Sequence, residues 1–278
     1  MRVVMPLFQF QYHGLDEFVF SDGQLSLRNF NHTHHDINLP IFSERDREYI
    51  KLEKHALVAE SDCFKELEYR QNVNLVLMAF RILGDDLTPF IKYRLSENDD
   101  FCSRLDETET HIFLPEHLYQ VYSVADFPRI DKAYMMLRNA EKIITRLKNA
   151  LFFLYKAFYS VHWIDAFLFH MNALEALFSL DDKRAATKAI KRRASALLGD
   201  PKNWDEAAIE QLYDTRSAIA HGRIVASANS TENLKLAAKM ERLTKLCFRK
   251  LIELDAFNHF STPTSREKFL GPVYLRLT

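Results

Sequence analysis

Apolar residues recur every three or four positions through most of the second half of the sequence. This spacing is typical of helices that pack one face into a core. The predicted helices run from Asp131 to about Ala150, Leu151 to Ser179 with a break near Ser160, Lys183 to Leu198, Asp205 to His221, and Thr231 to Phe257. Short connections such as residues 199–201 favour antiparallel neighbours. Only 6 glycines and 8 prolines occur in 278 residues, which disfavours an all-β barrel. The chain is therefore predicted to be mainly α, with an antiparallel helical bundle over residues 129–257.

A small α+β domain is predicted for residues 1–128, because apolar and β-prone runs alternate there with turn residues. The strands are expected at Val3–Phe10, Phe18–Phe20, Leu25–Leu27, Thr88–Leu95 and His111–Leu114, and the second and third form a hairpin. Helices are expected from Ser43 as N-cap through Glu60, and from Phe64 to Leu83 before Gly84. Residues 29–38 and the acidic residues 97–109 are predicted to be loops. In the tail, residues 258–278, a strand over Phe269–Leu277 is expected to return to the N-terminal domain.

Cysteine usage and hydropathy indicate a cytoplasmic protein without a membrane anchor. The three cysteines, Cys63, Cys102 and Cys247, are far apart and show no metal-binding spacing. The apolar run at the N-terminus is too short for a signal peptide. Charged and imidazole side chains interrupt the most hydrophobic window, residues 150–171, which predicts a buried helix rather than a membrane span.

The net charge of −1 conceals an asymmetry between the two halves of the chain. Residues 1–128 hold 12 Lys and Arg against 22 Asp and Glu, a balance of −10. Residues 129–257 hold 22 against 15, a balance of +7, and the tail adds +2. A basic helical half is compatible with a phosphate-containing partner such as RNA, although an excess of this size is also ordinary for a helical domain.

The segment Tyr213-Asp214-Thr215-Arg216-Ser217-Ala218-Ile219-Ala220-His221-Gly222 places a cation and an imidazole near the end of a predicted helix. The Arg216 guanidinium stays charged and can contact a phosphate with two donors, while a histidine such as His221 exchanges protons near neutrality. Gly222 stands where a helix C-terminus favours a left-handed residue. Arg216 and His221 are therefore the candidate catalytic residues. On an ideal helix they point about 140° apart, whereas Asp214, Ser217 and His221 share one stripe.

This segment resembles the motif of the HEPN superfamily, an Arg followed by four to six residues and a His. Together with residues 170–178 and 192–199, it is most similar to the Apea-like branch, and the resemblance covers about residues 130–257. The resemblance implies a homodimer in which two motifs line one cleft. It further implies a metal-independent endoribonuclease that needs no cofactor and cuts single-stranded or loop RNA by attack of the 2′-hydroxyl. Ser217 stands where active family members often have Asn, Asp or His.

Other polar residues near the motif are candidates for substrate binding. They are Ser217, Asp214 and Tyr213 within the segment, and Lys191 and Arg192 in the basic cluster before it. Each has a plainer interpretation: Tyr213 is more often a packing residue, and a basic cluster is often a solvated helix face. Glu175 and Arg193 have two interpretations: they help position the site, or they form a buried ion pair that fixes helix register. The ion pair is the favoured interpretation, because a charge on a core face needs a partner.

A histidine-rich segment is the one candidate for a metal site in the sequence. His32, His34, His35 and Asp36 lie within five residues, but so short a loop seldom closes a metal site, and no metal is predicted. No glycine-rich phosphate loop or dinucleotide-binding motif is present.

The first hypothesis is a HEPN-type endoribonuclease, which the resemblance associates with phage defence or stress, with the N-terminal domain restraining it or binding a regulatory protein. The alternative is a dimeric scaffold that binds RNA or a nucleotide without cutting it. A third hypothesis is a structural dimer whose N-terminal domain recognises another protein.

Overall fold

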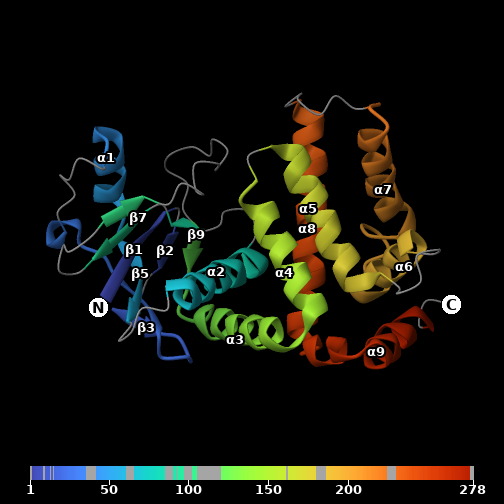
Figure 1. Ribbon diagram of the computed structural model, residues 1–278, viewed down its shortest axis with the longest axis horizontal. Helices are drawn as coiled ribbons and strands as arrows, with labels where there is room; N and C mark the ends of the chain where they lie inside the picture. Colours follow the sequence, from blue (N-terminus) through green and yellow to red (C-terminus); the bar gives the residue numbers. More distant parts are fainter. Residues whose placement is uncertain are drawn as a thin grey trace. The chain divides into compact units, whose positions relative to one another are not determined.

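The computed structural model describes residues 2–8, 10–12, 14, 16–35, 42–60, 66–84, 90–91, 93–96, 102–104, 120–160, 162–179, 186–223 and 230–275 (Figure 1). The chain divides into two compact units, Met1–Leu137 and Arg138–Thr278. The division falls within helix α3 (Phe127–Ile143), whereas the domain boundary predicted from sequence lies at the start of that helix. The predicted fold class is confirmed, because an α+β region with an antiparallel sheet precedes a mainly helical region.

The sheet of the first unit is antiparallel and is built around its N-terminal strand. Its strands lie in the order β3 (Glu17–Val19), β4 (Leu25–Asn29), β5 (His55–Glu60), β1 (Arg2–Phe8), β7 (Tyr93–Ser96) and β8 (Cys102–Arg104), and β6 (Phe90–Ile91) also pairs with β1. Separately, β2 (Phe10–Tyr12) pairs in parallel with β9 (Gln120–Tyr122). The predicted hairpin is confirmed: Glu17 of β3 faces Arg28 of β4, and their side chains form a 2.7 Å ion pair.

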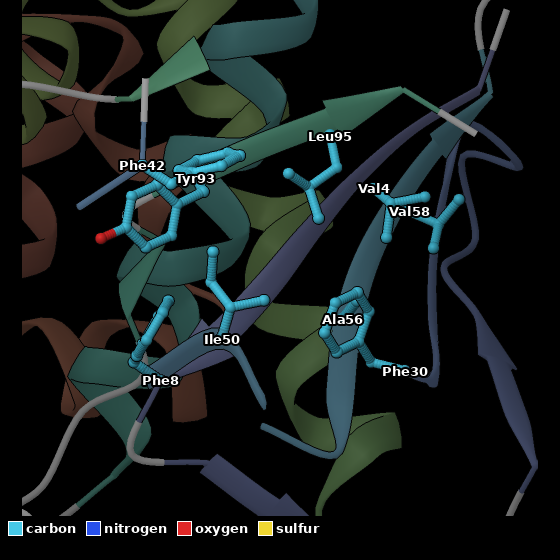
Figure 2. Packing of buried hydrophobic residues seen from close by; sticks show 9 residues of the cluster. All are labelled: Val4, Phe8, Phe30, Phe42, Ile50, Ala56, Val58, Tyr93 and Leu95. Atoms are coloured by element: carbon cyan, nitrogen blue, oxygen red, sulfur yellow. The ribbon is translucent and has the colours of Figure 1, made fainter. Parts of the chain in front are cut away.

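One face of this sheet carries a cluster of buried side chains (Figure 2). Residues two apart on a strand point to the same face, which brings residues of β1, β5 and β7 together with Ile50 of helix α1. The cluster comprises Val4, Phe8, Phe30, Phe42, Ile50, Ala56, Val58, Tyr93 and Leu95. The hydroxyl of Tyr93 donates to the buried Asp46, which also accepts from the backbone N–H of Ser43 at 3.1 Å. The start of α1 is thereby anchored to β7.

The helix predicted from Ser43 to Glu60 begins correctly but ends too late. Ser43 caps α1 (Glu44–Leu52) in a reciprocal capping box with Asp46. The backbone becomes extended at Glu53, and residues 55–60 form β5. This strand pairs on both sides, with β4 and with β1. Two ladders of backbone hydrogen bonds, closed by residues far away in the sequence, outweigh the local helical pattern.

The remaining predictions for this unit had mixed outcomes. Helix α2 (Glu66–Leu83) ends at Gly84 as predicted, and β6 and β7 confirm the described part of the strand predicted over residues 88–95. The loop prediction for residues 97–109 is wrong at β8, which pairs with β7. The predicted strand His111–Leu114 lies outside the described residues.

In the part of the chain that the structure describes, seven α-helices follow the strands of the first unit, and all but α3 lie wholly in the second unit. Beyond α3 they are α4 (Thr145–Phe158), α5 (Trp163–Phe178), α6 (Ala186–Leu198), α7 (Glu206–Ala220), α8 (Thr231–Glu253) and α9 (Pro263–Leu275), with a 3-10 turn over Phe257–Ser261. The single helix predicted over residues 131–150 is two helices, because the buried Ile144 has an extended backbone between α3 and α4. The break predicted near Ser160 is confirmed.

Helix α5 packs against both α4 and α8 and forms the centre of the helical unit (Figure 1). Its buried side chains include Trp163, Phe167, Met171, Leu174, Leu177 and Phe178. Among the described residues, no helix combines the length and the apolar character that crossing a bilayer requires.

The strand predicted in the tail is wrong, because residues 263–275 form α9. Pro263 occupies the first helical position, where its missing N–H costs nothing, and the Thr262 hydroxyl accepts from the backbone N–H of Ser265 at 3.1 Å. Helix α9 packs against α6, and the ring of Phe269 stacks on His259 with centroids 4.7 Å apart.

Candidate functional site

The ends of α7 are fixed by local hydrogen bonds. The Asp205 side chain accepts from the backbone N–H of Ala208 at 2.7 Å, which caps the N-terminus. At the other end, the backbone N–H of Gly222 donates to Ile219, and that of Arg223 donates to Ala218 at 2.8 Å. With φ of +67° at Gly222, these bonds form a Schellman motif, and the left-handed glycine predicted there is confirmed. The motif holds His221 as the C-cap residue of the helix.

The C-terminal half of α7 borders a cavity of about 450 Å³. One lining residue, Thr187, comes from α6. The others are Glu210, Tyr213, Asp214, Arg216, Ser217 and His221 of α7. Every candidate that the sequence motif supplied therefore lines this cavity. The angle of about 140° between ideal positions 216 and 221 does not separate them, because both border the same hollow.

Arg216 forms an ion pair with Glu175 of α5, with Nη1 and Oε1 2.5 Å apart. The Arg216 side chain is 43% exposed and that of Glu175 is 29% exposed, so the guanidinium remains accessible from the cavity. Burial raises the pKa of Glu175, and the positive charge of Arg216 offsets part of that rise. The pair joins residues 41 positions apart in the sequence.

The predicted pair between Glu175 and Arg193 does not form. Arg193 donates instead to the backbone carbonyl of Phe178, at the end of α5, at 2.8 Å, and it pairs with Glu267 of α9. The general expectation that a charge on a core face finds a partner holds for both residues, but each has a different partner from the one predicted.

Tyr213 borders the cavity but is largely buried. It is 7% exposed, and burial is the main reason that its pKa lies well above the ordinary value, followed by the charge of Glu175. Its hydroxyl has no hydrogen-bond partner within the described part of the chain. The packing interpretation of this residue therefore fits its burial.

The two basic residues proposed to contact substrate lie on α6 and pair with acidic residues of α7. Lys191 forms an ion pair with Glu210, and Arg192 lies 3.4 Å from Glu206, measured from Nε to Oε2. The Lys191 side chain is only 11% exposed. These charges hold α6 against α7, and Lys191 and Arg192 are not among the residues that line the cavity.

Sequence reasoning gave no role to two residues at this site, Thr187 and Glu210, and for Glu175 it favoured a pair with Arg193 over a role in positioning the site. Glu210 could have been found, because it precedes Asp214 by four residues and extends the same helical stripe. The sequence marks Glu175 as a charge on an apolar helix, but it does not identify Arg216 as its partner. Thr187 had no signal in the sequence.

The structure describes the three histidines of the histidine-rich segment but not Asp36. Residues His32–His34 form a short 3-10 helix. Within the described ranges no group of three or more His, Cys, Asp or Glu side chains could hold a metal ion.

No protein-family model, curated protein or solved structure matches this chain. Any assignment of function therefore depends on the side chains that line the cavity.

Proposed function

We propose that this protein is a metal-independent endoribonuclease of the HEPN type, acting in the cytoplasm in a defence or stress response. The observation that carries the proposal is that Arg216 and His221 border one cavity at the capped end of α7. A permanent cation and imidazole groups that can accept and donate protons are the groups that RNA cleavage without a metal needs.

In the proposed reaction, the 2′-oxygen of a ribose attacks the adjacent phosphorus as its proton passes to an imidazole. The bond from phosphorus to the 5′-oxygen then breaks, and a protonated imidazole gives a proton to that oxygen. The products are a 2′,3′-cyclic phosphate and a 5′-hydroxyl. Proton transfer by the imidazoles is general acid–base catalysis, which contributes about 10²–10⁴-fold in rate. Arg216 neutralises the charge that develops on the phosphoryl oxygens.

The reaction favours a homodimer, because it uses one imidazole to accept a proton and one to donate a proton. Among the described residues that line the cavity of a single copy, His221 is the one histidine. A second copy of the chain would supply a second His221. Single-stranded or loop RNA is the proposed substrate, since its backbone can reach the in-line geometry.

A specific observation supports the alternative, a dimeric scaffold that binds RNA or a nucleotide without cutting it. Glu175 already neutralises Arg216, and acidic residues of α7 neutralise Lys191 and Arg192. A site whose cations are paired binds phosphate more weakly and stabilises the transition state less. Whether the protein is a nuclease or a scaffold, the N-terminal unit is proposed to bind a regulatory or target protein.

The test is incubation of purified protein with mixed single-stranded RNA and excess chelator, followed by analysis of the ends produced. His221→Ala and Arg216→Ala are each expected to abolish formation of cyclic phosphate while the oligomeric state stays unchanged. His162→Ala and Arg242→Ala are the matched controls, because both residues are exposed and lie outside the cavity lining. Unchanged cleavage by pure His221→Ala protein would refute the proposal. Salt-dependent RNA binding without any cleavage by the wild type would favour the scaffold.

A further inference from the structure

The wall of the cavity along α7 carries carboxylates, a guanidinium and, at the C-terminal end of the helix, an imidazole. Glu210 and Asp214 lie one turn apart on the stripe that continues through Ser217 to His221. Arg216, two residues after Asp214, supplies a positive charge, and His221 places an imidazole at the C-terminal end of the helix. At 1.5 Å per residue, Asp214 and His221 are separated by about 10 Å along the helix axis. A ligand that suits this wall carries an anionic group for Arg216 and His221 and hydrogen-bond donors for Asp214.

Asp214 is the carboxylate of this wall that is available to a ligand. Glu210 is engaged by Lys191 from α6, and the Glu175 carboxylate is engaged by Arg216. The Asp214 side chain is exposed and makes no hydrogen bond or ion pair within the part of the chain that the structure describes. An ionised carboxylate accepts hydrogen bonds through both oxygens and donates none. It therefore selects for two neighbouring donors.

A nucleotide has the required shape and polarity. Its phosphate is the anionic end, and the outer edge of its base lies at a distance comparable to the separation of His221 and Asp214. The volume of about 450 Å³ lies within the range of about 300–1,000 Å³ usual for small-molecule sites. In single-stranded RNA the Watson–Crick edges of the bases are free to be read by side chains.

Among the four bases, guanine presents two adjacent donors, N1–H and the N2 amino group, on its Watson–Crick edge. Adenine and cytosine each place a ring nitrogen acceptor beside their amino group, and uracil flanks its single N–H with two carbonyl oxygens. These acceptors would repel a carboxylate. A site built around hydrogen bonds discriminates well against ligands that leave its polar groups unpaired.

We propose that Asp214 reads guanine, accepting hydrogen bonds from N1–H and the N2 amino group of a nucleotide whose phosphate is held at Arg216 and His221. The cavity therefore directs cleavage to bonds next to a guanosine. This inference rests on the proposed function and adds its base preference. Asp214 is a specificity residue in this scheme and takes no part in the proton transfers.

The test compares cleavage of fluorescent RNA oligonucleotides that are identical except at one position, which holds guanosine, inosine, adenosine, cytidine or uridine. Hydrogen bonds to a charged acceptor contribute enough for a preference of about 10- to 100-fold for guanosine over adenosine. Inosine lacks the N2 amino group and is expected to fall between them. Asp214→Asn is expected to lose the preference while still cutting the other oligonucleotides, because an amide replaces one acceptor by a donor. Asp165→Asn, at an exposed position in the first turn of α5, is the matched control and is expected to keep the preference.

The possible results separate this inference from the function on which it rests. Cleavage by the wild type at equal rates for all five bases would overturn the inference and leave the nuclease assignment intact. If the wild type cuts none of them, the nuclease assignment fails, and fluorescence anisotropy with the same oligonucleotides decides the inference. If the wild type binds the guanosine oligonucleotide more tightly than the others, and Asp214→Asn loses this difference, the protein recognises guanine as a scaffold that does not cut RNA. Equal binding to all five, or no binding, would overturn it.

Discussion

Replacing Glu175 by Gln tests whether the ion pair with Arg216 organises the site or merely neutralises it. The substitution keeps the size of the side chain and removes the charge that lies 2.5 Å from the guanidinium. If Glu175 positions Arg216 against the cavity, the guanidinium of the variant is free to adopt other rotamers. Its contact with the scissile phosphate then becomes less well aligned.

The structure bounds the size of both effects. With side chains 43% and 29% exposed, the pair is largely screened by solvent, and such pairs contribute about 0–1 kcal/mol to stability. For a domain of this size that corresponds to a decrease in Tm of at most about 4 °C. Misplacing a catalytic group by about 1 Å can cost up to about 10²-fold in rate, so kcat is expected to fall by about 10- to 100-fold. KM for RNA is expected to stay constant or fall, because a negative charge beside the phosphate site has been removed.

The assay is steady-state cleavage of an RNA oligonucleotide in chelator, with Tm measured on the same samples. Glu206→Gln is the control, because it removes a carboxylate from another Arg–Glu pair between helices, at Arg192, outside the cavity lining. A purely structural role for Glu175 would make the two variants behave alike. An unchanged or higher kcat in Glu175→Gln would refute the positioning argument. Tighter RNA binding by that variant, with no cleavage by either protein, would support the scaffold.

Two further predictions concern stability. Burial raises the pKa of Glu53 from 4.5 to about 8, so the unfolded chain releases this proton at lower pH than the folded chain. The free energy of unfolding should therefore decrease between pH 4.5 and 8, by up to about 1.4 kcal/mol per pH unit from this group. Urea unfolding of Glu53→Gln should lack that component, and parallel pH curves for wild type and variant would contradict the assignment. Gly222 at the end of α7 and Asp255 at the end of α8 both have positive φ at the same position of a Schellman motif. Gly222→Ala should therefore lower the free energy of unfolding by about 1 kcal/mol, and Asp255→Gly should raise it by up to about 1 kcal/mol. A Cβ at Gly222 would meet no heavy atom within 4 Å, so backbone strain alone determines whether Gly222→Ala raises or lowers stability. Shifts in Tm of equal size and sign for the two variants would exclude this explanation.

The parts of the fold that sequence reasoning predicted well are those governed by local interactions. Helix α7 begins and ends where its capping residues, Asp205 and Gly222, place it. The hairpin of β3 and β4 likewise depends on a short turn and on neighbouring alternation. Strand β5 was misassigned as helix because its strand character comes from β1 and β4, and nothing within residues 53–60 interrupts a helical pattern. Pairing between distant segments is not encoded in a local window.

The candidate site shows the same division between local and long-range information. One stripe of α7 brings Asp214, Ser217 and His221 to the cavity, and the helical period alone predicted this arrangement. The opposite wall, Thr187, and the partner of Arg216 come from other helices, and their placement depends on how α5, α6 and α7 pack. Helical periodicity identifies the face of a helix but not its neighbours.

The incorrect tail prediction and the incorrect ion pair both involve Arg193. The sequence pairs Arg193 with Glu175 because the two charges lie on successive predicted helices and a charge on a core face needs a partner. In the structure, α9 packs on α6 and brings Glu267 to Arg193, which also binds the carbonyl of Phe178. Glu175 pairs with Arg216 instead. The partner of the proposed catalytic arginine therefore comes from α5, 41 residues before it, and the motif alone does not identify that partner.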